Sequence, residues 1–179
     1  VVPLDTPMVI MIDPTNACNF KCTFCPTGDH PLLRQVARPK GQMKPELFHK
    51  IVDEIAGFPR KIKVIHLLKD GEPLLNKHII DFIKYVKTAD VAERVEMTSN
   101  AALMTSRISD GLVESGLDGI RISVEGTDVD TYRKVTRVFS NYDLVRSNVA
   151  YLFEAKQRKR PSMHIHSKIL DIALSAEQK

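Results

Sequence analysis

The sequence contains three cysteines and no fourth. All three, Cys18, Cys22 and Cys25, lie in one short stretch that follows an apolar run. An odd set of thiols in so short a loop cannot easily meet disulfide geometry, which excludes a scaffold held together by disulfides. Bacterial ferredoxin runs use a different spacing and contain a fourth cysteine. We therefore expect three thiolates turned toward one inorganic centre, with an open position where a ligand can bind and react.

The sequence also lacks the signatures of membrane insertion and export. No apolar run approaches the roughly 18 residues needed to span a bilayer. No charged head followed by an apolar core and a cleavage site opens the chain. Three reduced cysteines without such a signal fit a reducing compartment. We expect a cytoplasmic protein with no membrane partner.

Internal repeats and low-complexity segments are absent as well. The net charge is +4, and the basic residues are scattered except in the run 156–160, which is typical of a solvated helix end. This balance permits an anionic ligand, but it gives no reason to expect a nucleic-acid partner. The 179 residues, 43% of them hydrophobic, are enough for one domain with a sizeable core.

Apolar stretches of strand length alternate five times with amphipathic helical patterns. The expected strands are 8–12, 62–68, 94–98, 119–124 and 162–170. The expected helices are 44–57, 76–87, 106–115, 130–135 and 142–156, and another could begin within 171–179. This alternation predicts an α/β fold with a parallel sheet, right-handed crossovers and at least five βα units.

The first strand and the segment after the cysteines each carry a further expectation. The run 8–12 is continuously apolar, which is typical of a parallel strand buried on both faces. The segment 26–42 is polar and includes Arg34, Arg38 and Lys40, so we expect a long basic loop. Such a loop is either an exposed flexible segment or a lid, and its charge suits an anionic substrate or an electron donor.

Apolar stripes mark the buried faces of two expected helices. In 44–57 the stripe includes Leu47, and in 142–156 it includes Leu144 and Phe153. Residues at this helical spacing fall on one face. We therefore expect all three side chains to face the core.

Unusual residues come at the carboxyl ends of four expected strands. After the first strand come the cysteines, after the second Gly71, Glu72 and Pro73, at the third Ser99 and Asn100, and at the fourth Ser123 and Glu125. Reactive groups of parallel α/β sheets lie outside the carboxyl ends of the strands. The sequence therefore predicts that these residues form one site on a shared rim.

The cysteine triplet, with the aromatic Phe24 directly before the last cysteine, resembles the signature of the radical S-adenosylmethionine (radical SAM) enzymes. The resemblance extends over the chain in strand order, although only the cysteine motif is specific on its own. It implies a partial (β/α)6 TIM-like barrel, in which residues 1–179 are a core domain that is incomplete at its C-terminal end. The stretch 41–43 resembles the SPASM or twitch subgroup, so an extension with auxiliary clusters could follow.

The resemblance also implies roles for the rim residues. Cys18, Cys22 and Cys25 would bind three irons of a [4Fe-4S] cluster, and the amino and carboxylate groups of S-adenosylmethionine would bind the fourth. Phe24 would lie near the adenine. The family usually has Gly-Gly-Glu-Pro after the second strand, holding the methionine amino group, whereas this sequence has Asp70 before Gly71, Glu72 and Pro73. Gly71 would still allow close backbone approach.

The later strands would contact the rest of the cosubstrate. Ser123 and Glu125 resemble the position that contacts the ribose, and Ser99 and Asn100 resemble one near the methionyl group. The fifth strand would pack on the adenine around His166 and Lys168.

The implied activity is reductive cleavage of S-adenosylmethionine to methionine and a 5′-deoxyadenosyl radical, which abstracts hydrogen from a small-molecule, sugar or peptide substrate. A reducing electron donor of the flavodoxin or ferredoxin type would supply the electron. The cofactor carries the difficult chemistry, while the protein orients the reactants and excludes water.

Other interpretations stay open. The cysteines could form a structural zinc site with His30 as fourth ligand, or a redox pair that leaves Cys18 over. The chain could also be a module that binds S-adenosylmethionine without catalysis. Among the rim residues, Phe24 could be a hydrophobic plug, and the polar ones could be turn or capping residues.

Overall fold

A computed structural model describes residues 4–139, 142–170 and 174. Its strands are β1 (Val9–Ile12), β2 (Ile62–Leu67), β3 (Ala92–Ser99), β4 (Gly119–Val124) and β5 (His164–Ile169). Its α-helices are α1 (His30–Gln35), α2 (Pro45–Ile55), α3 (Ile79–Ala89), α4 (Ser106–Glu114), α5 (Val129–Thr136) and α6 (Tyr142–Lys159), and its 3-10 turns are η1 (Pro26–Gly28) and η2 (Pro73–Leu75). The helix expected within 171–179 falls outside the described residues, apart from Leu174.

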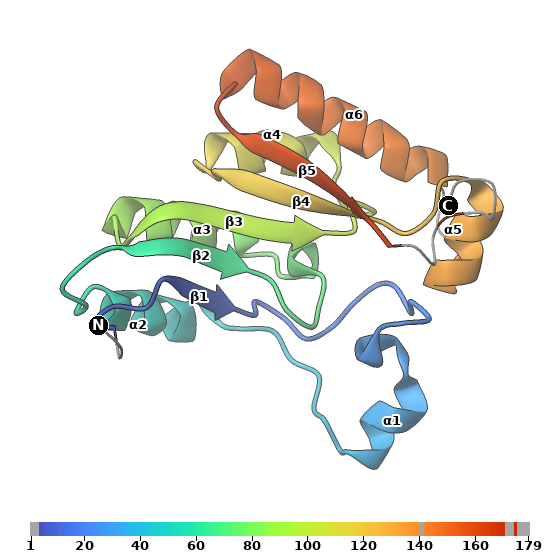
Figure 1. The fold of residues 1–179 in the computed structure, drawn as a ribbon, viewed down its shortest axis with the longest axis horizontal. Helices are drawn as coiled ribbons and strands as arrows, with labels where there is room; N and C mark the ends of the chain where they lie inside the picture. The colour runs from blue at the N-terminus through green and yellow to red at the C-terminus, as the bar shows by residue number, and fades with distance from the viewer. Residues whose placement is uncertain (1–3, 140–141, 171–173, 175–179) are drawn as a thin grey trace.

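The five strands form one parallel sheet in the order β1-β2-β3-β4-β5, with helices in the connections (Figure 1). This arrangement confirms the predicted α/β class with five βα units. Helices α2, α3 and α4 lie on the same side of the sheet. A parallel sheet covered by its crossover helices on one side has the arrangement of a section of barrel wall.

The hydrophobic core lies between the sheet and its helices. Val95, in the centre of β3, is fully buried, and the rings of Phe48 (α2) and Phe82 (α3) stack with centroids 4.0 Å apart. Across β2 to β5 the opposite face of the sheet is mainly polar. There His66 pairs in register with Glu96, with Nδ1 and Oε2 3.7 Å apart. The inner face therefore offers polar side chains to a ligand instead of a second apolar layer.

Strand β1 corrects the expectation of a strand buried on both faces. Val9 and Met11 are 45% and 60% exposed, whereas Ile12 is buried. β1 is an edge strand, and alternate side chains point to the uncovered inner face. A continuous apolar run therefore does not by itself establish burial on both sides.

The buried faces of α2 and α6 are narrower than the apolar stripes in the sequence predict. Leu47, Leu144 and Phe153 are all exposed, whereas Phe48 in α2 and Leu152 in α6 are fully buried. Each of these helices buries only the narrower arc that faces its neighbours.

The segment 26–42 is not an irregular loop throughout. It contains η1 and the short helix α1. Asp29 caps α1 by accepting a hydrogen bond from the Leu32 N–H at 3.0 Å, and Pro31 lies in the first turn, where proline is tolerated. A capping aspartate followed by proline is the local signal that predicts this helix.

Across the described residues, no helix combines the length and apolarity that a membrane crossing requires.

Candidate active site

The predicted rim residues meet around one cavity of about 270 Å³ at the carboxyl ends of the strands. Ten of the eleven candidates line it: Cys18, Cys22, Phe24, Cys25, Gly71, Glu72, Ser99, Asn100, Ser123 and Glu125. Pro73, which follows Glu72 in the chain, is buried and does not line the cavity. Sequence reasoning missed five further residues that line the cavity: Phe20, Leu68, Lys69, Thr98 and Arg121. For Thr98 and Arg121 the usable signal was strand alternation, which places them on the inner face.

The turn after β2 packs tightly on the backbone that leads into the cysteines. A Cβ atom on Gly71 would lie 1.9 Å from the Thr15 carbonyl oxygen and 2.6 Å from that of Ala17. The next residue, Glu72, donates its N–H to the Ala17 carbonyl oxygen at 2.8 Å. Gly71 is therefore required because two protein segments approach closely here. The sequence analysis expected the glycine to allow close approach of a ligand instead.

Asp70, which replaces the family's usual first glycine, has a structural role. Its carboxylate forms an ion pair with Arg38, which follows α1 in the chain. Its carbonyl oxygen accepts a hydrogen bond from the Thr27 hydroxyl at 2.7 Å. The turn thus also holds the segment on the far side of the cysteines, and both contacts explain how an aspartate is accommodated here.

Glu72 is buried, with 2% of its surface exposed. Its carboxylate accepts hydrogen bonds from the Ser99 hydroxyl at 2.8 Å, the Asn100 N–H at 2.8 Å and the Leu74 N–H at 3.2 Å. Burial raises the pKa of Glu72, and these three donors oppose that rise by stabilising the carboxylate. Glu72 therefore fixes the end of β3 against the turn after β2.

Asn100 extends this network to the cysteines. Its side-chain amide donates to Asn19 Oδ1 at 2.9 Å and lies 3.9 Å from Cys18 Sγ. The Phe20 N–H also donates to the same sulfur at 3.4 Å. Hydrogen-bond donors directed at a sulfur stabilise its thiolate form. Asn100, at the end of β3, therefore favours the form of Cys18 that binds a metal.

The cysteine loop rests on α5 and is closed at its base. The N–H groups of Lys21 and Thr23 donate to the last carbonyls of α5, at 3.0 and 2.9 Å. At the base, Thr15 and Gln42 form an antiparallel bridge, and the Thr15 hydroxyl donates to the Gly41 carbonyl oxygen at 2.8 Å. These contacts hold the loop at both flanks, although it has no regular strand or α-helix around the three thiols.

The thiols are free and half-buried. Burial raises the pKa of Cys18, and burial together with the nearby Glu125 charge raises the pKa of Cys22 to about 12. Both thiols are therefore protonated at neutral pH until a metal centre displaces their protons.

The surroundings of the thiols do not support a zinc site with His30. That residue lies in α1 and lines a separate hollow with Arg34 and Arg38. Within residues 4–139, 142–170 and 174, no three His, Cys, Asp or Glu side chains converge closely enough for a single metal ion.

The end of β4 provides an unsatisfied acceptor. Glu125 lines the cavity and is buried, and its Oε2 has no hydrogen-bond partner in the described part of the chain. Burial raises the pKa of Glu125, although Lys168 lowers it in part. A buried acceptor of this kind is costly unless a donor fills it. It therefore fits a hydroxyl-bearing ligand in the cavity.

The β5 residues divide between the cavity and the open face. Lys168 lines the cavity, whereas His166 does not. His166 is exposed and stacks on His164, with ring centroids 6.0 Å apart. The structure thus brings only one of the two β5 candidates to the site.

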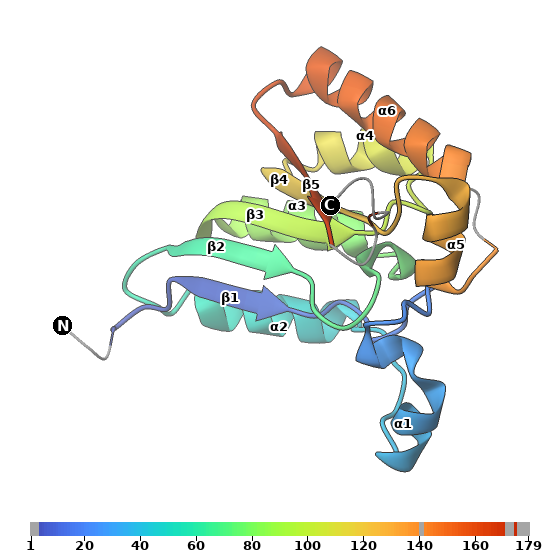
Figure 2. The same ribbon diagram turned by 45° about the vertical axis from the view of Figure 1, so that its right-hand side comes forward.

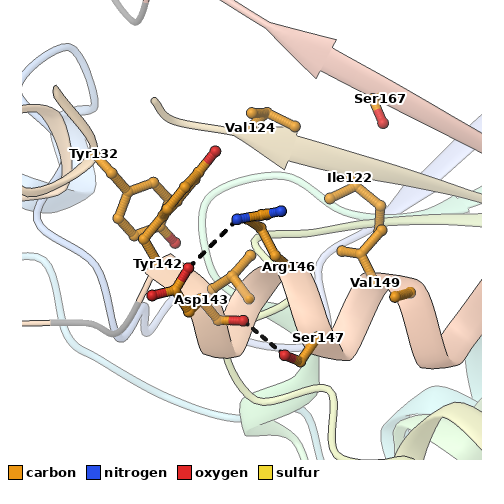
Figure 3. Close-up of a pocket in the computed structure, with 11 residues that line it drawn as sticks. Ile122, Val124, Tyr132, Tyr142, Asp143, Arg146, Ser147, Val149 and Ser167 are labelled. Carbon is orange, nitrogen blue, oxygen red and sulfur yellow. Dashed lines mark hydrogen bonds and ion pairs between the residues drawn. The ribbon is translucent and has the colours of Figure 1, made fainter. Parts of the chain in front are cut away.

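A larger cavity of about 590 Å³ lies elsewhere, between α6 and the helix-covered side of β4 and β5 (Figure 3). It contains none of the predicted site residues. Its polar groups bond one another: Arg146 pairs with Asp143 at 3.5 Å, and the Ser147 hydroxyl donates to the Asp143 carbonyl oxygen at 2.9 Å. We assign the chemistry to the smaller cavity, because the thiols and the unsatisfied carboxylate lie there.

Comparison with known proteins identifies relatives of the chain. A family model described as the Radical SAM superfamily matches residues 12–167. The chain is 32% identical over 129 residues to a GTP 3′,8-cyclase of Chlorobaculum tepidum, covering 72% of this chain and 36% of that protein. It is 30% identical over 148 residues to a probable GTP 3′,8-cyclase of Methanopyrus kandleri, covering 81% and 43%. The chain thus spans less than half the length of these relatives.

Solved structures share the fold. Streptococcus suis SuiB bound to S-adenosylmethionine aligns with a TM-score of 0.73 at 18% identity, covering 98% of this chain and 36% of that chain. The protein anSMEcpe with bound AdoMet aligns with a TM-score of 0.66 at 15% identity, covering 91% and 43%. At these identities the likeness concerns the fold, and it confirms the predicted partial barrel.

Proposed function

The chain belongs to the radical SAM superfamily, whose cofactors are a [4Fe-4S] cluster and S-adenosylmethionine, and from this premise we propose that it forms the core of an enzyme that cleaves S-adenosylmethionine reductively. Membership confirms the expected enzyme class and cofactors. The assignment of 1–179 as a core domain and the SPASM or twitch subgroup remain predictions. A cytoplasmic location, which keeps the thiols reduced, belongs to the same proposal.

One observation carries the proposal: three free thiols and a buried, unpartnered carboxylate oxygen share one cavity at the carboxyl ends of parallel strands. When bound, the two cofactors supply a 5′-deoxyadenosyl radical that removes hydrogen from a substrate. Cys18, Cys22 and Cys25 hold the iron as thiolates. Glu125 accepts a hydrogen bond from a ribose hydroxyl, which would satisfy its Oε2.

The remaining candidates orient the cosubstrate. Phe24, half exposed at the mouth of the cavity, offers its ring to the adenine. Ser123, two residues before Glu125 in the chain, adds a hydroxyl group to the same cavity. The backbone of Gly71 faces the cavity from the turn, while the Glu72 carboxylate is already engaged by Ser99 and Asn100. In this proposal Glu72 and Pro73 act by shaping the turn rather than by touching the methionine.

The test uses the full-length protein under anaerobic conditions. Reconstitution with iron and sulfide should give a brown protein that absorbs near ~400 nm, as thiolate-ligated iron–sulfur clusters do. The reduced protein should release 5′-deoxyadenosine from S-adenosylmethionine. Cys22→Ala should lose both properties, and the matched control His30→Ala should keep both. Stoichiometric zinc without iron uptake would refute the proposal, and a cluster without 5′-deoxyadenosine would indicate an inactive binding module.

We further propose an anionic substrate, with GTP as the first candidate because the relatives are named for it. Lys69, Arg121 and Lys168 line the cavity, and none of the three lies within ion-pair distance of a described carboxylate. Three such cations beside the reaction chamber suit phosphate or carboxylate groups. Incubation with GTP should consume it in step with 5′-deoxyadenosine formation. Unchanged GTP under turnover conditions would restrict the proposal to reductive cleavage and redirect the search to sugars or peptides.

A further inference from the structure

The segment 26–42, which follows the last cysteine, packs little of its surface on the rest of the molecule. We call this segment the strap. Its helix α1 contains no buried residue, and the apolar side chains of Leu32 and Val36 are 40% and 59% exposed. Figure 2 shows α1 projecting away from the sheet. A helix without a buried face gains little from tertiary packing, so the position of the strap depends on a few contacts on either side of α1.

Asp70, in the turn after β2, contacts the strap on both sides of this helix. Before α1, the Thr27 hydroxyl donates a hydrogen bond to the Asp70 carbonyl oxygen at 2.7 Å. After α1, the Arg38 guanidinium forms an ion pair with the Asp70 carboxylate. A single residue therefore clasps the strap, and the ion pair is the side-chain half of that clasp.

A second carboxylate depends on the same guanidinium. Asp13 Oδ2 accepts a long hydrogen bond from the Asp70 N–H at 3.4 Å, and Asp13 Oδ1 is buried without a hydrogen-bond partner among the described residues. Burial and the Asp70 charge raise the pKa of Asp13, whereas the Asp70 N–H and Arg38 lower it in part. Arg38 thus offsets two neighbouring carboxylates, which favours the closed position of the strap.

The clasp is nevertheless weak enough to open. The side chains of Arg38 and Asp70 are 39% and 29% exposed, so solvent screens their attraction. An ion pair of this kind shifts an equilibrium by about threefold to fivefold. The strap can therefore leave its closed position without unfolding of the sheet.

The strap begins directly on the cysteine loop. The Gly28 N–H donates a hydrogen bond to the Cys25 carbonyl oxygen at 2.9 Å. A Cβ atom on Gly28 would lie 2.7 Å from the Lys21 carbonyl carbon and 2.9 Å from the Cys22 carbonyl oxygen. The first turn of the strap is thus packed against the backbone between the thiols, and its movement would change their exposure.

We propose that the strap gates access to the three thiols, and that Arg38 and Asp70 form the clasp that keeps it closed. The open strap would admit iron and sulfide while a cluster is assembled, and the closed strap would shield the thiolates from solvent. The inference rests on the proposed function for the identity of the incoming metal, whereas the movement itself belongs to the metal-free chain. A glycine at position 70, as the family usually has, could not form this ion pair.

Arg38→Gln tests the clasp, and Arg34→Gln is the matched control. Arg34 lies in α1 and has no described carboxylate within ion-pair distance. In the metal-free full-length protein, amide hydrogen exchange in a peptide covering 26–42 should be about threefold faster in Arg38→Gln and unchanged in the control. Asp70→Asn should have the same effect, and the double variant Arg38→Gln/Asp70→Asn should add nothing further. Arg38→Lys, which keeps the charge, should restore most of the protection.

Iron exchange gives the second readout. Because a gate changes the rates of entry and exit equally, anaerobic iron uptake with sulfide and iron loss to a chelator should both be about threefold faster in Arg38→Gln, with the same final iron content. Unchanged hydrogen exchange in Arg38→Gln would overturn the inference, as would a lower final iron content, which indicates a purely structural role. If Arg38→Gln misfolds, Asp70→Asn and Arg38→Lys provide the same comparison. An unmodified protein that takes up no iron would refute the proposed function, and hydrogen exchange in the metal-free protein would still decide whether the clasp exists.

Discussion

The Ser99 hydroxyl donates a hydrogen bond to Glu72 Oε1 at 2.8 Å, which joins the end of β3 to the turn after β2. The other carboxylate oxygen accepts the Asn100 N–H at the same distance. Both oxygens are thus engaged inside the protein. The carboxylate therefore positions two strand ends relative to each other, and the site depends on it even without ligand contact.

Glu72→Gln tests this positioning role. An amide replaces one acceptor oxygen by a donor, so at least one of the three N–H or O–H groups around it loses its partner. We expect a loss of about 1–3 kcal/mol in the free energy of unfolding, measured by urea denaturation. The exposed control Glu93→Gln, which breaks only a surface pair with Lys63, should cost about 1 kcal/mol or less. Equal losses in the two variants would argue against the role.

Gly71→Ala tests the packing of the turn on the cysteine loop. The new methyl group would lie 1.9 Å from the Thr15 carbonyl oxygen, so backbone must move. We expect destabilisation of more than about 3 kcal/mol, or loss of iron binding with retained fold. Gly41→Ala is the matched control, because a Cβ there meets nothing within 4 Å. That change should be neutral or stabilise by up to about 1 kcal/mol, and a similar loss in both variants would contradict the packing argument.

Glu125→Gln should separate cosubstrate binding from stability. Because the pKa of Glu125 is raised, the native state binds the carboxyl proton more tightly than the unfolded state, in which the pKa is near 4.5. The contribution of Glu125 to the free energy of unfolding therefore falls as the pH rises above 4.5. The variant should gain stability relative to the unmodified protein between pH 5 and pH 8, measured by urea denaturation of the metal-free protein. Its Kd for S-adenosylmethionine should rise about tenfold, and unchanged affinity would remove Glu125 from the ribose site.

The metal-free thiol of Cys22 should be unreactive at moderate pH. Its pKa of about 12, against an ordinary value of 9.0, favours the neutral thiol at every pH below 12. Each unit lowers the thiolate fraction tenfold, so alkylation by iodoacetamide at pH 8 should be about a thousandfold slower than after unfolding in urea. Mass spectrometry of the Cys22 peptide measures both rates. Because iron binding must displace the proton, cluster assembly should also become more complete from pH 6 to pH 9.

The composition of the site was largely predictable from the sequence, because parallel strands bring their carboxyl ends to one edge. Four strand ends and a cysteine loop therefore implied one cavity, and ten of eleven residues line it. The contacts of Gly71 with Thr15 and Ala17 were not predictable, since they join segments far apart in the chain. Arg121 was missed although strand alternation places it on the inner face, because alternation alone does not tell which inner-face residues lie beside the cysteines.

The fold was predictable at the level of strand and helix order, and less so in burial. Val9 and Met11 look like core residues, but β1 is an edge strand whose inner face is uncovered. Exposure there depends on what lies opposite, which is a tertiary property. The short helix α1 was missed because proline and polarity suggested a loop, while the Asp29 cap that starts the helix is a weaker signal.

The bridge between Thr15 and Gln42 makes the cysteine loop and α1 an insert that closes at its own base. A change in the length of such an insert should alter the stability of the fold only slightly, because the entropic cost of closing a loop rises slowly with the number of residues it contains. Residues of α1 could then be exchanged for a short linker without moving the strands or the base. Such a chimera would keep the three thiols and lose Arg34, the basic residue of α1, so metal assembly could be measured apart from that charge.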